Sequence, residues 1–245
     1  MQIGEARRFP ANVNRPAYMR RNNYFFLLGG LCLLLLTAPV VSELRGPLWV
    51  IDLEISISGL LLVGVWSLYR SRRSLYLGLV LVAVSLLSTL VSVVLGYESV
   101  RWLPLLSLLI FLGLSSVVAL RQVVAPGPVD LNRIVGAVCV FLMLGVIWAV
   151  LYYLLETIVP GSFSGLDSDS EPLWFWRLIY FSFITLTTLG YGDITPANAF
   201  SEPLAYFEAI VGQFYIAVVV ASLVGSYMAG QENPKAVSHS ENGDS

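Results

Sequence analysis

The residues with the clearest chemical potential form a short run in which glycine alternates with bulky side chains: Thr188, Leu189, Gly190, Tyr191 and Gly192. Because glycine has no Cβ, it adopts backbone angles that turn successive carbonyl oxygens toward one side of an extended segment. Such oxygens are able to replace the water shell of a dehydrated cation. We predict that the carbonyl oxygens of the first four residues coordinate a cation, with the Thr188 hydroxyl adding a ligand at the inner end.

The segment before this run, residues 173–188, is apolar and aromatic and suits a helix, which the following glycines end. It is too short to cross a bilayer and return by itself, so we predict a re-entrant helix. Extended backbone at membrane depth is tolerated only where it is buried in protein or lines a watery cavity. The negative end of this helix dipole would favour a cation at its C-terminus.

The composition predicts an all-α membrane protein. The 245 residues are 57% hydrophobic and 12% charged, whereas a soluble domain normally carries roughly 25% charged residues. The apolar residues fall in blocks of roughly 20, the length that crosses a hydrocarbon core about 30 Å thick. The net charge of −2 and the lack of a long basic patch give no indication of nucleic-acid binding.

Cysteine and histidine usage argues against enzymatic and metal chemistry. Cys32 and Cys139 lie inside apolar blocks without Cys-x-x-Cys spacing, so we expect free thiols. The single histidine, His239, lies in the polar tail, and no cluster of histidine, cysteine and acidic residues is evident. We therefore expect no catalytic residues, no cofactor and no enzyme.

Six apolar blocks are long enough to span a bilayer, with the re-entrant segment between the fifth and the sixth. The blocks are residues 24–41, 47–69, 75–95, 102–120, 133–159 and 203–228. This pattern divides the chain into an N-terminal segment, four helices, a linker, a pore domain and a disordered tail. The corresponding ranges are residues 1–23, 24–121, 122–132, 133–229 and 230–245.

Charge asymmetry predicts the orientation. Most basic residues, including Arg70–Arg73, fall on the side that holds both termini, and few lie opposite. Positively charged loops favour the cytoplasm, so we expect a multi-pass protein of the plasma (cell inner) membrane with both termini and the linker in the cytoplasm. The Arg70–Arg73 loop would then contact lipid headgroups, and acidic Asp167, Asp169 and Glu171 would face outward.

The fourth block, residues 102–120, has no charge between Arg101 and Arg121. Voltage sensing needs several arginines that move through the field, each contributing ~2.3 kcal/mol per 100 mV. We therefore predict that the first four helices lack an Arg-rich voltage sensor. Asp52 and Glu54 of the second block are read as interfacial carboxylates.

The run Thr188-Leu189-Gly190-Tyr191-Gly192-Asp193 resembles the Thr-Val-Gly-Tyr-Gly-Asp signature of tetrameric potassium channels. The wider stretch of residues 179–196 looks like the pore loop of the bacterial two-helix ion-channel domain family, and the final helix, with residues 208–217 and 223–227, is similar to that family's inner helix. The resemblance covers about residues 135–229. It implies a homotetramer that conducts K⁺ passively through a filter formed by residues 188–192, with K⁺ bound at Thr188, Leu189, Gly190 and Tyr191.

The sequence departs from the family pattern in two places. Leu189 replaces the commoner valine, and Tyr180, Phe181 and Ile184 stand where relatives often have two tryptophans and an acid. We therefore expect Asp193 to lack the partners it often has. Thr187 and Asp193 are taken as filter support.

Two questions stay open from the sequence. Gly212 is a candidate gating hinge, although transmembrane glycines also serve close packing. The alternatives to a potassium-selective channel subunit are a weakly selective cation channel, which Leu189 would allow, and a regulatory subunit that conducts little alone. The expected partners are K⁺, membrane lipids and further copies of the chain.

Overall fold

The computed structural model describes residues 24–43, 72–95, 103–125, 131–166 and 171–238. They form helices α1 (Tyr24–Glu43), α3 (Arg72–Leu95), α4 (Leu103–Val124), α5 (Leu131–Ile158), α6 (Glu171–Leu186) and α7 (Ser201–Ser238). Two short strands, β1 (Phe163–Ser164) and β2 (Thr195–Pro196), pair antiparallel on either side of α6 in sequence. The described part of the chain is therefore mostly helical, as predicted.

Three described helices are long and apolar enough to cross a membrane: α4, α5 and the Ser201–Ser222 part of α7. Shorter apolar stretches lie within α1, α3 and α6. The predicted second block, residues 47–69 with Asp52 and Glu54, lies outside the described residues. The six-span topology accordingly stays a prediction.

Helix α7 is longer than the sequence predicts. A disordered tail was expected from residue 230, but α7 continues to Ser238. Glu232, Lys235 and Ala236 are good helix formers, although Pro234 between them lacks the amide hydrogen for a helical hydrogen bond. The predicted boundary is thus too early, while His239 lies outside the described residues.

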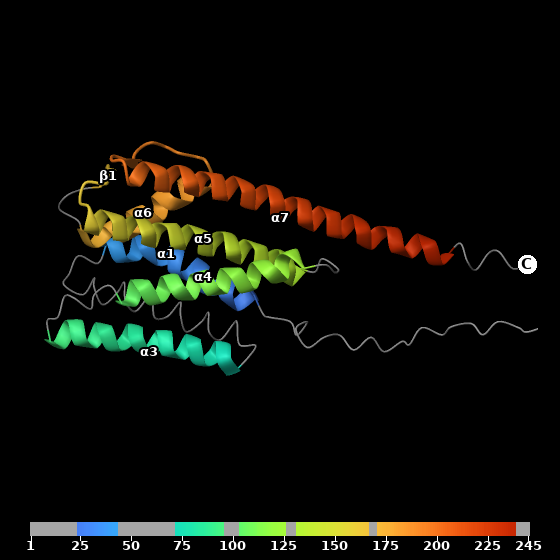
Figure 1. Cartoon of the computed structure of the whole chain (residues 1–245), viewed down its shortest axis with the longest axis horizontal. Coiled ribbons are helices and arrows are strands. Elements are labelled where there is room, and N and C mark those ends of the chain that lie inside the picture. The colour runs from blue at the N-terminus through green and yellow to red at the C-terminus, as the bar shows by residue number, and fades with distance from the viewer. Residues whose placement is uncertain (1–23, 44–71, 96–102, 126–130, 167–170, 239–245) are drawn as a thin grey trace, which may run out of the picture.

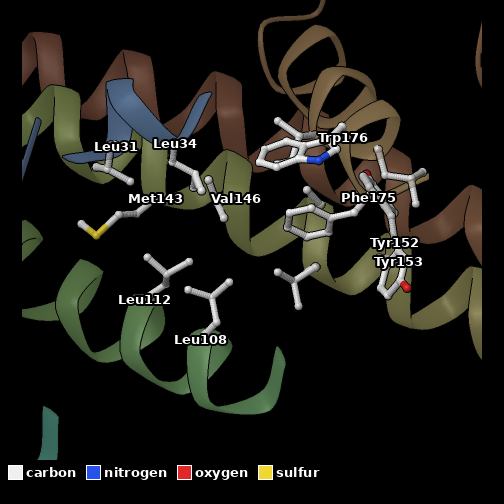
Figure 2. Packing of buried hydrophobic residues seen from close by; sticks show 14 of the residues in the cluster. Leu31, Leu34, Leu108, Leu112, Met143, Val146, Tyr152, Tyr153, Phe175 and Trp176 are labelled. Carbon is white, nitrogen blue, oxygen red and sulfur yellow. The ribbon is translucent and has the colours of Figure 1, made fainter. Parts of the chain in front are cut away.

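Helix α5 is the centre of the bundle, since it packs against α1, α4, α6 and α7. Helix α3 packs against α4, and Figure 1 shows α3, α4, α5 and α7 running roughly along one direction. Figure 2 shows the apolar side chains that join the helices: Leu31 and Leu34 of α1, Leu108 and Leu112 of α4, and Met143 and Val146 of α5. Because lipid tails are as apolar as leucine, these side chains join the helices mainly through van der Waals packing.

The start of α1 is docked on the junction between α4 and α5. The Tyr24 hydroxyl and Gln122 Oε1 are 2.7 Å apart, and the Tyr24 amide donates to Asn132 Oδ1 at 3.2 Å. Arg133 of α5 donates to the carbonyls of Val123 and Ala125, which would otherwise be unpaired at the end of α4. Arg121 is the single charged residue of α4 and lies in its last turn.

Candidate functional site

The predicted filter residues lie directly after the C-terminus of α6. The amides of Leu189 and Gly190 both donate to the Ile184 carbonyl, at 2.8 and 3.1 Å, and the Thr188 amide donates to the Thr185 carbonyl at 2.9 Å. These bonds satisfy carbonyls that a helix end leaves unpaired. The filter segment is therefore attached to the helix that precedes it through backbone hydrogen bonds.

The backbone of this segment alternates in handedness. Thr188, Gly190 and Gly192 have positive φ angles of 58°, 50° and 78°, while Leu189 and Tyr191 between them do not. Thr188 is the one residue with a Cβ that adopts positive φ in the described part of the chain, at a cost of roughly 1–2 kcal/mol. Positive φ at every second residue turns neighbouring peptide groups relative to one another, and glycine adopts such angles without a Cβ penalty.

The residues after the filter segment pair with the residues after α5. We call these two stretches, residues 159–166 and 193–201, the outer connection. Strand β1 follows α5 and strand β2 follows the filter, with Phe163 opposite Pro196 and Ser164 opposite Thr195. Beside this pair, the Ala197 amide donates to the Ser162 carbonyl at 2.8 Å. The exit of the filter is thereby tied to the end of α5.

Gly165 makes the closest approach in the outer connection. It has a φ of +88°, and a Cβ at this position would collide with the Asp193 backbone carbonyl. Arg177 of α6 donates through Nη2 to the Gly165 carbonyl at 2.9 Å. Only glycine satisfies both the backbone angle and the space, so Gly165 belongs to the site although its place in a loop gave no hint of this.

Asp193 is not without a partner, contrary to the expectation from sequence. Its carboxylate interacts with the Tyr180 hydroxyl of α6. Tyr180 stands where relatives often have tryptophan, and a phenol O–H is a donor just as an indole N–H is. Tyr180 therefore gives Asp193 a partner with the same donor chemistry, which the expectation missed because it considered residue identity alone.

The inner end of the filter contacts α7. Gln213 Nε2 is 3.3 Å from the Thr188 hydroxyl oxygen. One residue earlier, a Cβ at Gly212 would collide with the Leu186 carbonyl at the end of α6. Close packing against α6 thus explains the glycine at position 212. Helix α7 continues through Gly212 without a break. The role of Gly212 as a gating hinge stays a prediction. Thr187 points its hydroxyl back to the Phe183 carbonyl at 2.6 Å.

A buried polar junction lies where α5, α6 and α7 meet. Glu208 of α7 contacts the Tyr152 hydroxyl of α5 and the Ser182 hydroxyl of α6, and Ser182 also contacts the Gly145 carbonyl of α5. The sequence analysis included Glu208 only as part of a resemblance. A glutamate inside an apolar helix is costly and often functional, and this signal would have identified it.

The remaining chemical candidates are few. Cys32 and Cys139 are both free thiols, and Cys139 is buried beside the Tyr24 carbonyl. The described residues contain no group of three or more histidine, cysteine or acidic side chains arranged to hold a metal ion.

Two comparisons with known proteins match part of the chain. A family profile described as "Ion channel" matches residues 139–228, which include α6, the filter segment and most of α7. The protein named two pore potassium channel c, from Oryza sativa subsp. japonica, is 28% identical over 75 residues. That alignment covers 31% of this chain and 16% of the rice protein. No solved structure matches the chain.

Together, these matches and the apolar helices support a membrane protein that carries an ion-channel domain similar to those of potassium channels. An ion-channel domain is non-enzymatic, which agrees with the expectation from composition.

Proposed function

We propose that this chain is one subunit of a homotetrameric, potassium-selective channel that conducts K⁺ passively across a cell membrane. Residues 188–192 form its filter, and K⁺ binds to the carbonyl oxygens of Thr188, Leu189, Gly190 and Tyr191. The observation that carries the proposal is the positive φ at Thr188, Gly190 and Gly192, because alternating backbone handedness suits a strand that lines an ion path with carbonyl oxygens.

Assembly of several copies is supported by what the single chain leaves uncovered. The side chains of the filter residues Leu189 and Tyr191 are 55% and 67% exposed, and Phe214 on α7 is 67% exposed. Large apolar side chains next to a polar ion path are unfavourable unless neighbouring copies or lipid cover them. One strand also presents oxygens from one direction only, so a closed ring of subunits is needed to surround an ion.

Exposed apolar side chains also support the proposed arrangement in the membrane. The chain is a multi-pass protein of the plasma membrane, its lipid contacts lie on the outer surfaces of α3 and α4, and both termini are cytoplasmic. Exposed leucines such as Leu87, Leu106 and Leu114 on these helices suit contact with acyl chains.

Flux through liposomes tests the proposal. Purified protein should carry K⁺ down its gradient, and reversal potentials in mixed K⁺ and Na⁺ should lie close to that of K⁺. Gly190→Ala should lower K⁺ flux at least about tenfold, because a Cβ at positive φ costs roughly 1–2 kcal/mol in every subunit. Gly113→Ala is the matched control, since a Cβ there also meets nothing within 4 Å but the residue is helical; its flux should be unchanged.

Two results would replace the proposal. Equal permeation by K⁺ and Na⁺ would indicate a weakly selective cation channel. Absence of flux from folded, correctly assembled protein would indicate a regulatory subunit that depends on a conducting partner.

A further inference from the structure

The polar junction between α5, α6 and α7 contains a carboxyl group that the proposed conduction does not use. Glu208 is 0% exposed even in the isolated chain, so no neighbouring subunit or solvent molecule on the surface has access to it. A buried carboxylate without a compensating charge is very costly, and such groups usually become neutral or acquire a partner. The state of this carboxyl therefore depends on the few atoms around it.

Those atoms come from two other helices. The Tyr152 hydroxyl of α5 contacts Glu208 Oε2. On the other side, Ser182 Oγ of α6 lies 2.5 Å from Glu208 Oε1 and 2.7 Å from the Gly145 carbonyl oxygen of α5. The junction thus contains three close oxygen–oxygen contacts that link three helices.

Each of these contacts requires one proton between its two oxygen atoms. Tyr152 supplies one proton and Ser182 supplies one, while the Gly145 carbonyl supplies none. If Glu208 were ionised, the single Ser182 proton would have to serve both Glu208 Oε1 and the Gly145 carbonyl, and one pair would be left as two facing lone pairs. If Glu208 is protonated on Oε1, each contact has its own proton.

The surroundings offer no charge to stabilise the ionised form. Among the described residues, no lysine or arginine forms an ion pair with Glu208, and the titratable group that faces it is the Tyr152 phenol of α5. The Tyr152 ring packs against Phe163 and Phe181, at centroid distances of 5.1 Å for both. Helix α6 presents Ser182, which does not titrate.

We infer that Glu208 carries its carboxyl proton in the folded protein and donates it to Ser182. This completes a directed chain of hydrogen bonds, from Tyr152 to Glu208, from Glu208 to Ser182, and from Ser182 to the Gly145 carbonyl. Glu208 is thereby a positioning residue, because its proton fixes α6 between α5 and α7. Ser182 lies on α6, the helix that the filter residues directly follow. The junction therefore fixes the position of the helix that precedes the filter.

Infrared difference spectroscopy of the full chain in lipid bilayers at neutral pH tests this inference directly. The spectrum of the native protein minus that of Glu208→Gln should show the carbonyl stretch of a protonated carboxylic acid, with a shift in D₂O. In Tyr152→Phe this band should persist and move to higher frequency, because Oε2 is then the carbonyl oxygen and loses its donor. Loss of a carboxylate band in Glu208→Gln, with no acid band, would overturn the inference.

Glu156 of α5 supplies the matched control. It is also buried, but its two oxygens accept from the amides of Gly161 and Phe163, so Glu156→Gln should remove a carboxylate band from the spectrum. The readout is vibrational and needs no ion flux, so its result is independent of whether the channel proposal is correct.

Thermal unfolding of two variants gives a second reading. In Glu208→Gln the amide oxygen accepts from Tyr152 and one N–H donates to Ser182, while the second N–H gains no partner, so the midpoint should fall by about half as much as in Glu208→Ala. Glu208→Ala should lower it by about 5 °C or more, because the Ser182 and Tyr152 hydroxyls lose their partner. A glutamine variant that is as unstable as the alanine variant, or that does not fold, would contradict a neutral side chain at this position.

Discussion

Two buried glutamates in the pore region have opposite surroundings. Glu156, at the outer end of α5, is 4% exposed and accepts hydrogen bonds from the amides of Gly161 and Phe163, at 2.8 and 3.0 Å. Glu208, inside the helix junction, is surrounded by two hydroxyl groups and a carbonyl. Backbone N–H groups only donate, which suits a carboxylate. The Glu208 junction has three oxygen–oxygen contacts but receives only two protons, one from Tyr152 and one from Ser182.

The difference teaches that burial alone does not determine the charge of an acid. In these two sites the number of protons that the neighbouring groups supply indicates the charge of the acid, because each close pair of oxygen atoms needs one proton between them. The two regions also differ in what holds them. The outer connection is held by backbone amides and carbonyls. The junction is held by contacts of the Glu208 side chain with two hydroxyl groups, and a neutral side chain of the same shape is able to make similar contacts.

The largest effect is expected at Gly165, where the outer connection leaves no room. Gly165→Ala should reduce the free energy of unfolding by about 4 kcal/mol or more, because the new Cβ meets the Asp193 carbonyl and displaces the filter exit. Gly161→Ala is the control, since Gly161 also has positive φ but open space; it should cost only about 1–2 kcal/mol. Denaturant unfolding in detergent followed by circular dichroism measures both, and equal losses would remove the proposed collision.

A smaller but still large effect is expected at Glu156. Glu156→Gln should cost about 2–3 kcal/mol, because the amide NH₂ of glutamine faces an amide donor and one charge-assisted hydrogen bond is lost. The same unfolding measurement on Glu208→Gln should show a smaller loss, because the junction already holds a neutral side chain and only the second N–H of the amide lacks a partner. The comparison between the two regions fails if the two glutamine variants are equally destabilised, or if their order is reversed.

The smallest effect is expected for a single hydroxyl of the junction. Tyr152→Phe should cost about 1 kcal/mol, because Glu208 Oε2 then loses its donor while the ring packing is kept. Tyr215→Phe is a suitable control: its hydroxyl donates to the Ala137 carbonyl at 2.6 Å, an oxygen inside α5 that keeps its helical partner, so this variant should lose less. A larger loss for Tyr215→Phe in thermal unfolding would count against the special position of Tyr152.

Much of the helical architecture was predictable, because helices depend on local sequence. The apolar blocks at residues 24–41, 75–95, 102–120 and 133–159 agree with α1, α3, α4 and α5 within a few residues at each end. The break after α6 was also predictable, since Gly190 and Gly192 end the preceding helix. The tail boundary was wrong because helix propagation from α7 was not considered.

The candidate site was predicted only in part. Its filter residues are consecutive, so their alternating pattern is visible in the sequence. The interaction between Tyr180 and Asp193 was missed because Tyr180 precedes the filter residues in the sequence and Asp193 follows them. Gln213 was missed because its contact with Thr188 arises only once α7 folds back against α6.

The sequence by itself determined which segments are helical and where the backbone must leave the helix. These properties depend on apolar length and on glycine, and both act within a few residues along the chain. Only the tertiary structure decided that Gly165 faces the Asp193 carbonyl and that Glu208 needs a proton of its own. Both depend on atoms from elements far apart in sequence, whose proximity is established by packing.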